Sequence, residues 1–462
     1  MSNDLKQKLG LFSAIMVVVS AMIGSGVFKK ISNMSSELGN VNWVLLAWVV
    51  AGSITLIGSL CNAEVAGLIP KSGGQYVYFS KIYGRFFSFL FGWASFSVIQ
   101  TATAASVAYI FAESLNSLLN IHFSIGEMSN LTLFTLGDFS LQPFNNFNVK
   151  LIAIALISAL TLVNYRGIEY GEKISNILGV TVIVGILIII VFGIFSNPAT
   201  ELQAVADTTT IKTISISTFF AAMMSAFWAY EGWNNVGYLS GEIKHPNKNV
   251  PKAFVFGTSI VILLYLLVNW AYFQINGIDF YSRLGDGKIA AVETLNTVWK
   301  YGGLLISILI VISTFNSTNN SVMSAARIYH AMANDGLFIP SAGKTHPKYK
   351  TPHLSLIYQW IWCIVLIVSG SFDVLTEMLV FVAFIFYGCG ALGVIILRKK
   401  MKEVERPFKT PLYPILPILF VVFSAVLVIV TLIDNPVQSM IGMLLVLLGI
   451  PLYLYYNKKQ MI

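Results

Sequence analysis

Apolar segments long enough to cross a membrane follow one another along the whole chain, and short polar connections separate them. A run of about 20 apolar residues spans the hydrocarbon core of a bilayer as a helix. Hydrophobic residues make up 56% of the 462 positions and charged residues only 11%, against about 25% charged residues in soluble proteins. A soluble or disordered chain is excluded, because too little polar surface remains to cover these side chains. We predict an all-α membrane protein with twelve transmembrane helices, at about residues 12–36, 41–68, 83–112, 149–165, 174–196, 214–241, 252–275, 295–333, 354–370, 374–398, 412–433 and 437–456.

Lysine and arginine residues are distributed unevenly between the two sets of connections. With the N-terminus placed inside, 22 of the 29 basic residues fall on the inner side and 7 on the outer side. Because basic side chains are retained in the cytoplasm, we predict a multi-pass protein of the plasma membrane with both termini cytoplasmic. The net charge of +8 follows from this bias, and we expect no nucleic-acid partner. The three cysteines lie inside apolar runs and give no evidence for a disulfide-linked accessory subunit.

The first apolar segment contains a poor helix interior, Gly24-Ser25-Gly26, near its middle. Each glycine costs about 1 kcal/mol relative to alanine inside a helix. A break within lipid also frees backbone groups that must find partners, so it is tolerated only where the backbone lines a cavity. The alternative is a face of small residues that packs against another helix. The spacing alone leaves both interpretations open.

The sixth segment carries polar residues in the middle of an otherwise apolar run, namely Glu231, Gly232, Asn234 and Asn235. An ionisable residue inside a membrane segment is costly and therefore a functional candidate. The alternative is that Glu231 lies near an interface and faces water. The first, sixth and eighth segments are all too long or too interrupted for single plain helices.

The two interrupted segments lie five spans apart, so a second five-helix unit enters the membrane from the opposite side. Two interrupted helices at corresponding positions of inverted halves point to a transporter site. Free amides near Gly26 suit a carboxylate, since a helix N-terminus carries partial positive charge. Free carbonyls near Ile23 and Trp228 suit an ammonium group. A ligand with both groups a few ångströms apart is an α-amino acid.

At these residues the sequence resembles the amino acid–polyamine–organocation (APC) superfamily of transporters. It is most similar to the L-type and alanine-serine-cysteine exchangers and their bacterial serine/threonine-exchanging relatives. The motifs that carry the resemblance are Ile23 to Phe28, Ala63-Glu64 with Pro70 to Tyr78, Trp228 to Asn234, and Gly241 to Ala253. The resemblance implies a LeuT-type fold, with inverted repeats at 1–200 and 201–400 and two further helices at 401–462. It also implies a gating loop at Pro70 to Tyr78 and no enzymatic chemistry, and we expect Glu64 to pair with a basic residue of a loop.

The substrate site that this resemblance implies lies at the two breaks and consists of Ile23, Gly24, Ser25, Gly26, Val27, Trp228, Glu231 and Asn234. The substrate carboxylate is expected on the amides of the first break. The amine is expected on the carbonyls of Ile23, Trp228 and Glu231. The resemblance also places Trp228 as an aromatic gate and the Asn234 side chain next to the substrate.

The chain departs from the family in its fifth apolar segment. Many relatives carry a lysine there that stands in for a sodium ion, but segment 174–196 contains no lysine. Counted from Tyr170-Gly171, the position is Val182. A sodium-independent exchanger is therefore one of several possibilities.

The hydroxyls of Ser317 and Thr318 resemble the sodium site of LeuT-type symporters, with the carbonyls of Ser20 and Ile23 completing it. Oxygen ligands suit a hard cation such as Na⁺. The alternative is that these hydroxyls bond their own backbone or a neighbouring helix. Glu231 could carry a proton instead, so a Na⁺- or H⁺-coupled symporter stays open beside an exchanger. No other cofactor is expected.

Other function classes lack support in the sequence. No GxGD, GxSG or HExxH pattern is present, and Gly343-Lys344-Thr345 lacks the other glycine of a P-loop. A channel calls for repeated polar rings along a pore, and none is apparent. A transporter-fold amino acid sensor stays a remote alternative. The sequence thus predicts a secondary transporter of L-amino acids. The small glycines and Asn234 favour neutral amino acids, while Glu231 leaves a cationic or polar substrate open.

Overall fold

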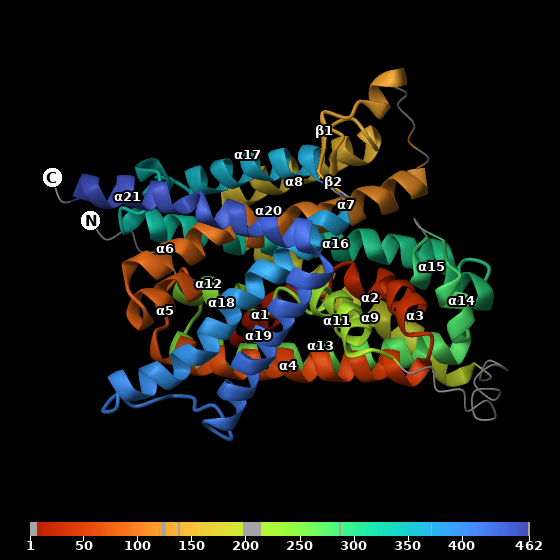
Figure 1. Ribbon diagram of the computed structural model, residues 1–462, viewed down its shortest axis with the longest axis horizontal. Helices are drawn as coiled ribbons and strands as arrows, with labels where there is room; N and C mark the ends of the chain where they lie inside the picture. The colour runs from red at the N-terminus through yellow and green to blue at the C-terminus, as the bar shows by residue number, and fades with distance from the viewer. Residues whose placement is uncertain are drawn as a thin grey trace.

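The computed structural model describes residues 7–119, 121, 126–136, 139–196, 214–285, 288–370 and 372–460. Helices dominate this part of the chain (Figure 1). In chain order the elements are α1 (Leu11–Met22), α2 (Gly26–Lys29), α3 (Ile31–Leu38), α4 (Val41–Leu68), α5 (Gln75–Ile82), α6 (Arg85–Ala94), η1 (Ser95–Ile99), α7 (Gln100–Leu119), η2 (Gly126–Asn130), β1 (Phe134–Leu136), β2 (Phe139–Leu141), α8 (Phe147–Arg166), α9 (Ile168–Phe195), α11 (Ile216–Ala229), α12 (Asn235–Tyr238), η3 (Ser240–Glu242), α13 (Pro246–Ile275), α14 (Ile278–Ser282), α15 (Ala290–Val298), α16 (Gly302–Asn334), η4 (Pro340–Gly343), α17 (His353–Ser369), α18 (Phe372–Lys400), α19 (Ile415–Asp434), α20 (Pro436–Leu447) and α21 (Gly449–Gln460).

Nine helical stretches in the described part of the chain are long and apolar enough to cross a membrane. They are α4, α6 to α7, α8, α9, α13, α16, α18, α19 and α20 to α21. Three shorter apolar helices, α1, α11 and α17, have 12, 14 and 17 residues. This set of helices makes the chain a multi-pass membrane protein.

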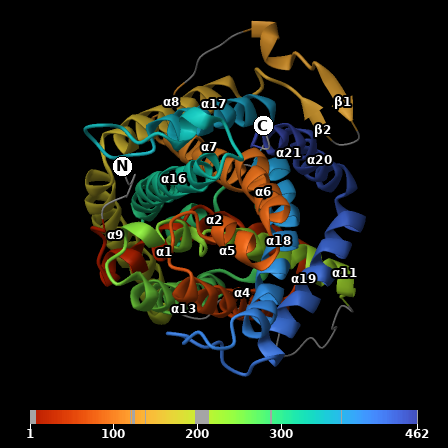
Figure 2. The same cartoon turned by 90° about the vertical axis from the view of Figure 1, so that its left-hand side faces the viewer.

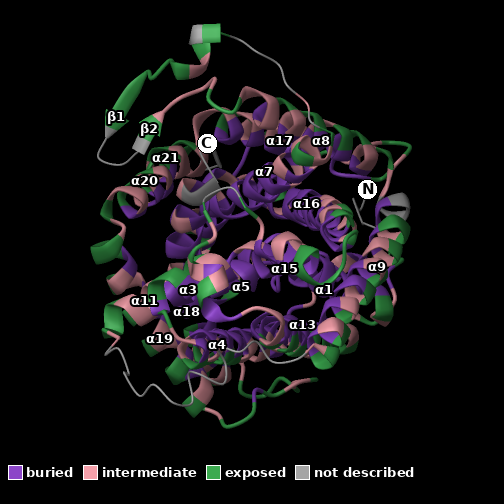
Figure 3. Cartoon of the chain, turned by 90° about the vertical axis from the view of Figure 1, so that its right-hand side faces the viewer, coloured by how far each residue is buried: buried purple, intermediate pink, exposed green. Residues whose placement is uncertain are grey.

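The helices form a bundle in which α1, α5 and α16 lie near the middle when the molecule is viewed end-on (Figure 2). The stretch Arg85–Leu119 is the most enclosed, with 89% of its most apolar window buried. The corresponding fractions for Ile415–Asp434 and Pro436–Lys458 are only 28% and 22%. Exposed residues follow the rim of the bundle and buried residues fill its centre (Figure 3). The exposed rim is apolar, as at Leu162, Ile177 and Ile429, so it faces lipid.

A small antiparallel sheet interrupts the all-helical pattern between α7 and α8, where β1 pairs with β2 and Phe134 lies opposite Leu141. We did not predict these strands. Their sequences, Phe-Thr-Leu and Phe-Ser-Leu, alternate apolar and polar residues and are separated by two residues. That pattern is typical of a hairpin. We did not recognise it because it covers few residues and lies between much longer apolar runs.

The eighth predicted segment is two helices rather than one. Helix α15 ends at Val298, and α16 then continues for 33 residues without a break. The interruption therefore falls before the polar stretch of α16 and not inside it. Serine, threonine and asparagine side chains can be carried inside such a helix because neighbouring helices supply hydrogen-bond partners.

Both chain termini lie at one end of the bundle, together with the connection between α18 and α19 (Figure 1). We call this end the terminal end. The opposite end carries α14 and α15, with β1 and β2 at its margin, and we call it the hairpin end (Figure 1). At the terminal end Leu9 forms a parallel bridge to Ile243, which ties the start of the chain to the segment after α12.

Candidate functional site

The first apolar segment is interrupted where the sequence predicts it. Helix α1 ends at Met22, Ile23 has non-helical dihedral angles of −76° and 84°, and α2 begins at Gly26. The first amides of a helix have no acceptor within that helix, and no backbone acceptor outside the helices meets the N–H of Ser25, Gly26 or Val27 in the described part of the chain. The Ser25 hydroxyl is 2% exposed and has no partner among the described residues. These donors are free to bind a ligand.

The sixth segment is interrupted as well. Helix α11 ends at Ala229, a turn follows, and α12 begins at Asn235. Gly232 lies in this turn with a φ of +108°. An L-residue with a side chain rarely adopts that backbone conformation. The glycine is therefore part of what makes the break possible.

The backbone of each break packs closely against the end of the other broken helix. A Cβ atom on Gly26 would lie 2.4 Å from the Cβ of Ala229, and one on Gly232 would lie 2.8 Å from the backbone carbonyl carbon of Ala21. Such distances are too short for carbon atoms in contact. The two glycines thus allow a reciprocal close approach that brings the free backbone groups of both breaks together.

Tyr265 on α13 bridges the two broken helices. Its hydroxyl donates to the carbonyl of Met22 at 2.8 Å and lies 3.1 Å from the carbonyl of Ala229. The ring is fully buried and packs at 5.6 Å against Trp48 and 5.1 Å against Tyr230. Sequence reasoning missed this residue, because a tyrosine within an apolar helix carries no signal of its own.

Hydroxyls on α16 reach the first break. Ser313 donates to the carbonyl of Ile23 at 2.8 Å, and Ser317 donates to the carbonyl of Ala21 at 2.9 Å. Thr318 instead donates to Thr314 on its own helix at 2.7 Å. Of the two residues in the predicted sodium site, Ser317 therefore faces α1 and Thr318 bonds within α16.

Gly179 on α9 lies close to Ser20. A Cβ atom on Gly179 would lie 2.5 Å from the Ser20 hydroxyl oxygen. Val182 is the residue that we predicted at the position of the relatives' lysine. It is buried and lies about one turn further along the same helix. The Ser20 hydroxyl is buried and has no partner among the described residues.

The polar side chains of the second break bond to distant helices. Glu231 is 7% exposed and accepts a hydrogen bond of 2.6 Å from the hydroxyl of Tyr387 on α18. It therefore does not face water. Asn234 accepts a hydrogen bond of 2.6 Å from the side chain of Asn62 on α4. The amide nitrogen of Asn234 and the whole side-chain amide of Asn235 have no partner in the described structure.

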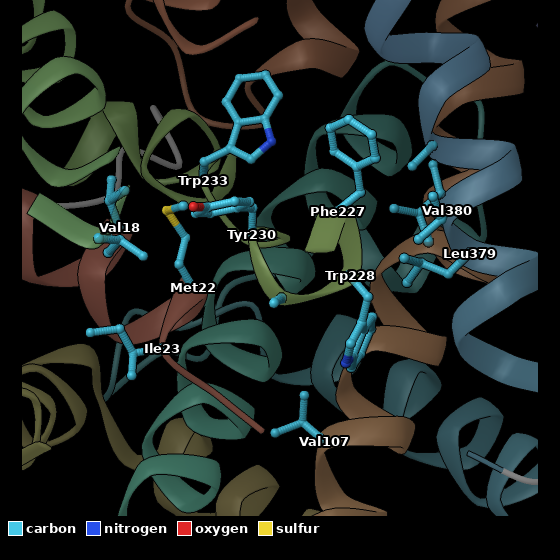
Figure 4. Packing of buried hydrophobic residues seen from close by; sticks show 14 of the residues in the cluster. Val18, Met22, Ile23, Val107, Phe227, Trp228, Tyr230, Trp233, Leu379 and Val380 are labelled. Atoms are coloured by element: carbon cyan, nitrogen blue, oxygen red, sulfur yellow. The ribbon is translucent and has the colours of Figure 1, made fainter. Parts of the chain in front are cut away.

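Trp228 forms part of a cavity that opens toward the hairpin end. This cavity has a volume of about 240 Å³ and is also lined by Lys30, Glu37, Glu377 and Asp434. In Figure 4 the indole of Trp228 points away from the rings of Tyr230 and Trp233. Trp228 thus lines the hairpin-end cavity, and its role as an aromatic gate stays a prediction.

The terminal end of the site is closed by several contacts. Arg327 and Glu242 form a fully buried ion pair at 2.8 Å. The amides of Lys8 and Leu9 donate to the carbonyl of Glu242 at 2.9 and 3.0 Å. The loop predicted to act in gating contributes the N–H of Gly73, which donates to the carbonyl of Tyr238 at 3.0 Å.

A multi-pass bundle with two broken helices in mutual contact has the architecture of a membrane transporter. The chain belongs to the amino acid permease family within the APC superfamily, and the family model matches residues 9–452. It is an amino acid transporter and not an enzyme.

Three relatives illustrate this membership. The chain is 31% identical to the serine/threonine exchanger SteT of Bacillus subtilis (strain 168) over 99% of this chain and 98% of the relative. It is 27% identical to the human b(0,+)-type amino acid transporter 1, over 98% of this chain and 89% of the relative. It is 29% identical to the human large neutral amino acids transporter small subunit 2, over 98% of this chain and 82% of the relative.

Proposed function

We propose that this transporter exchanges neutral L-amino acids across the cytoplasmic membrane by alternating access. The observation that carries the proposal is the contact between the two breaks, where free amides and the Ser25 hydroxyl of one helix meet the polar turn of the other. The relative SteT is named a serine/threonine exchanger, which supports exchange of small neutral substrates. In this proposal the fold is the LeuT type with twelve transmembrane helices, repeats at 1–200 and 201–400, and two additional helices at 401–462.

The substrate carboxylate binds the amides of Ser25, Gly26 and Val27, where the start of α2 provides partial positive charge. The amine binds carbonyls at the ends of α1 and α11. The Ile23 carbonyl already accepts one hydrogen bond from Ser313, and a carbonyl oxygen has a second lone pair for the amine. Asn234 offers its unpartnered amide nitrogen to the substrate side chain.

The terminal end faces the cytoplasm in this proposal, because most basic residues lie on that side. The buried pair of Arg327 and Glu242 then closes the cytoplasmic path. The hairpin-end cavity that Trp228 lines then leads to the extracellular solution. Transport requires that these two closures open in turn.

Proton coupling is a second candidate, and the surroundings of Glu231 favour it. Its carboxylate accepts a hydrogen bond from Tyr387, and no lysine, arginine or histidine in the described part of the chain pairs with it. A buried carboxylate without a counter-ion is costly to keep charged. Coupling to Na⁺ through Ser20, Ile23, Ser317 and Thr318 stays a third possibility, in which Ser317 is the hydroxyl that already faces α1.

The test is uptake of radiolabelled L-amino acids into liposomes that contain the purified protein. Uptake that requires unlabelled amino acid inside, and is indifferent to Na⁺ and pH gradients, supports exchange. Uptake into empty liposomes that an inward proton gradient drives supports coupling through Glu231, and Glu231→Gln should then abolish the gradient effect. Uptake driven by Na⁺ supports the sodium site. No saturable, stereoselective uptake under any of these conditions contradicts the proposed function.

A further inference from the structure

Residues 398–415 carry an unusual concentration of basic residues at the terminal end. They comprise the last turn of α18, the segment that joins it to α19 and the first residue of α19, and we call them the α18–α19 connection. Six basic residues and two acidic ones fall within residues 398–409, namely Arg398, Lys399, Lys400, Lys402, Arg406 and Lys409 against Glu403 and Glu405. Basic clusters directly beside a membrane helix attract anionic lipids. We propose that this connection is a binding surface for anionic phospholipid headgroups of the cytoplasmic leaflet.

Three of the basic residues hold the connection in place. Arg398 donates to both carboxylate oxygens of Glu64 at 2.9 and 2.8 Å, and Arg406 donates to Glu64 at 3.0 Å. Lys400 donates to the carbonyl of Ile82 at 2.8 Å. Because Glu64 is only 2% exposed on α4, these bonds fix the shape of the connection and leave its remaining charges to act outward.

The other three basic residues make no polar contact within the described part of the chain. Lys399, Lys402 and Lys409 are exposed. In the described structure no carboxylate lies within 4.0 Å of their ammonium groups, and none of them forms a hydrogen bond within the chain. Their charge is therefore available to an anionic partner.

Apolar side chains are exposed in the same connection, with fractions of 44% at Val404, 69% at Leu412 and 64% at Ile415. Lysines next to exposed apolar side chains are typical of a segment at the boundary between headgroups and acyl chains. The connection projects outward from the bundle at the terminal end, beside α4 (Figure 1). This placement on the cytoplasmic leaflet rests on the orientation proposed above.

A second lysine-rich loop at the terminal end provides the contrast. Lys344, Lys348 and Lys350, between α16 and α17, are also exposed. No large apolar side chain is exposed among the described residues from 339 to 352. The positive-inside bias accounts for both loops, but only the α18–α19 connection combines free charge with apolar contacts.

A lipid bound here touches elements that reach the substrate site. Helix α18 carries Tyr387, which bonds Glu231, and α4 carries Asn62, which bonds Asn234. Glu64 joins the ends of these two helices through Arg398. Anionic lipid therefore stabilises one relative position of α4 and α18, and the rate of exchange depends on lipid composition.

The experiment compares two triple variants of the full-length protein, Lys399→Gln/Lys402→Gln/Lys409→Gln and the control Lys344→Gln/Lys348→Gln/Lys350→Gln. Native mass spectrometry measures binding of phosphatidylglycerol, with phosphatidylcholine as the neutral reference. Each lysine near an anionic surface contributes about fivefold in affinity, so loss of all three in the first variant should reduce the preference for phosphatidylglycerol by about a hundredfold. The control variant should keep it.

Amino acid exchange in vesicles of phosphatidylcholine, with and without phosphatidylglycerol, gives the second readout. The wild type and the control variant should change rate when phosphatidylglycerol is added, while the first variant should not. Equal lipid binding by both variants, or no preference for phosphatidylglycerol in the wild type, overturns the proposal. If no vesicle supports exchange but the binding difference persists, the proposed function fails and the lipid surface stands.

Discussion

The two helix breaks differ in the polar groups that they contain and in the helices that bind those groups. The first break, between Met22 and Gly26, contains no ionisable side chain, and its carbonyls accept hydrogen bonds from hydroxyls on α13 and α16. The second break carries Glu231 and Asn234, whose partners are side chains on α18 and α4. We infer a division of roles. In the proposed function, the first break binds the carboxylate and shares the amine with the end of α11, whereas the side chains of the second break respond to the substrate side chain or to a proton.

The largest effect is expected at the contact between the breaks. Gly26→Val should abolish substrate binding and transport, because even a Cβ atom would lie 2.4 Å from the Cβ of Ala229 and would force the two helix ends apart. Radioligand binding and liposome exchange provide the measurement.

Gly10→Val, at the start of α1, is the matched control. No atom lies within 4 Å of the Cβ position of Gly10, so a side chain there meets open space. This variant should keep most of its activity. Normal transport by Gly26→Val would remove the first break from the substrate site.

Tyr265→Phe should give the next largest effect, because it removes the hydroxyl that lies on the carbonyls of both breaks. Loss of a buried hydrogen bond of this kind costs about 1–3 kcal/mol in the free energy of unfolding. We expect a lower melting temperature. We also expect about a tenfold lower exchange rate if the bond is worth about 1.4 kcal/mol in the activation free energy of transport.

Tyr272→Phe, two turns further along α13, supplies the control. The Tyr272 ring is fully buried, and its hydroxyl has no partner in the described part of the chain. Removing that hydroxyl should leave stability and exchange near the wild-type values. Equal losses in both variants would show that Tyr265 acts through packing and does not couple the breaks.

Sequence reasoning located both breaks because glycines and polar residues inside apolar runs are costly in lipid unless the backbone there lines a cavity. It also anticipated that Glu64 pairs with a basic residue of a loop, which is Arg406, but it did not anticipate the second partner, Arg398 in the last turn of α18. It did not find Tyr265 or Tyr387. Their hydroxyls matter only because folding brings them to a break from another helix, and an isolated tyrosine in an apolar helix predicts nothing about its partner.

Trp228→Ala tests whether Trp228, at the end of α11 next to the second break, acts as a gate. We expect KM to rise about tenfold, as is common when a central aromatic contact is removed, while the fold persists. Phe227→Ala is the control of similar size, because Phe227 packs against Phe384 at 4.7 Å and Phe423 at 5.5 Å. That variant should lose stability without a matching change in KM. An unchanged KM in Trp228→Ala would exclude it as a gate.

The smallest effect is expected from removing hydroxyls of α16, because these contact the first break and not the second. Ser317→Ala removes a donor to the carbonyl of Ala21 and should slow exchange about two- to fivefold, as the loss of a typical hydrogen bond of about 0.5–1 kcal/mol implies. Thr318→Ala should have almost no effect, because its hydroxyl bonds to Thr314 within the same helix.

The pair of variants also decides the coupling ion, provided that exchange is measured over a range of Na⁺ concentrations. If Na⁺ binds between α1 and α16, both substitutions should raise the Na⁺ concentration needed for half-maximal uptake, since both hydroxyls would then be ligands. If the hydroxyls only hold the first break, Ser317→Ala should be slower at every Na⁺ concentration and Thr318→Ala should match the wild type. The second outcome leaves Glu231 as the remaining candidate for ion coupling, and it assigns any response to a proton to the second break.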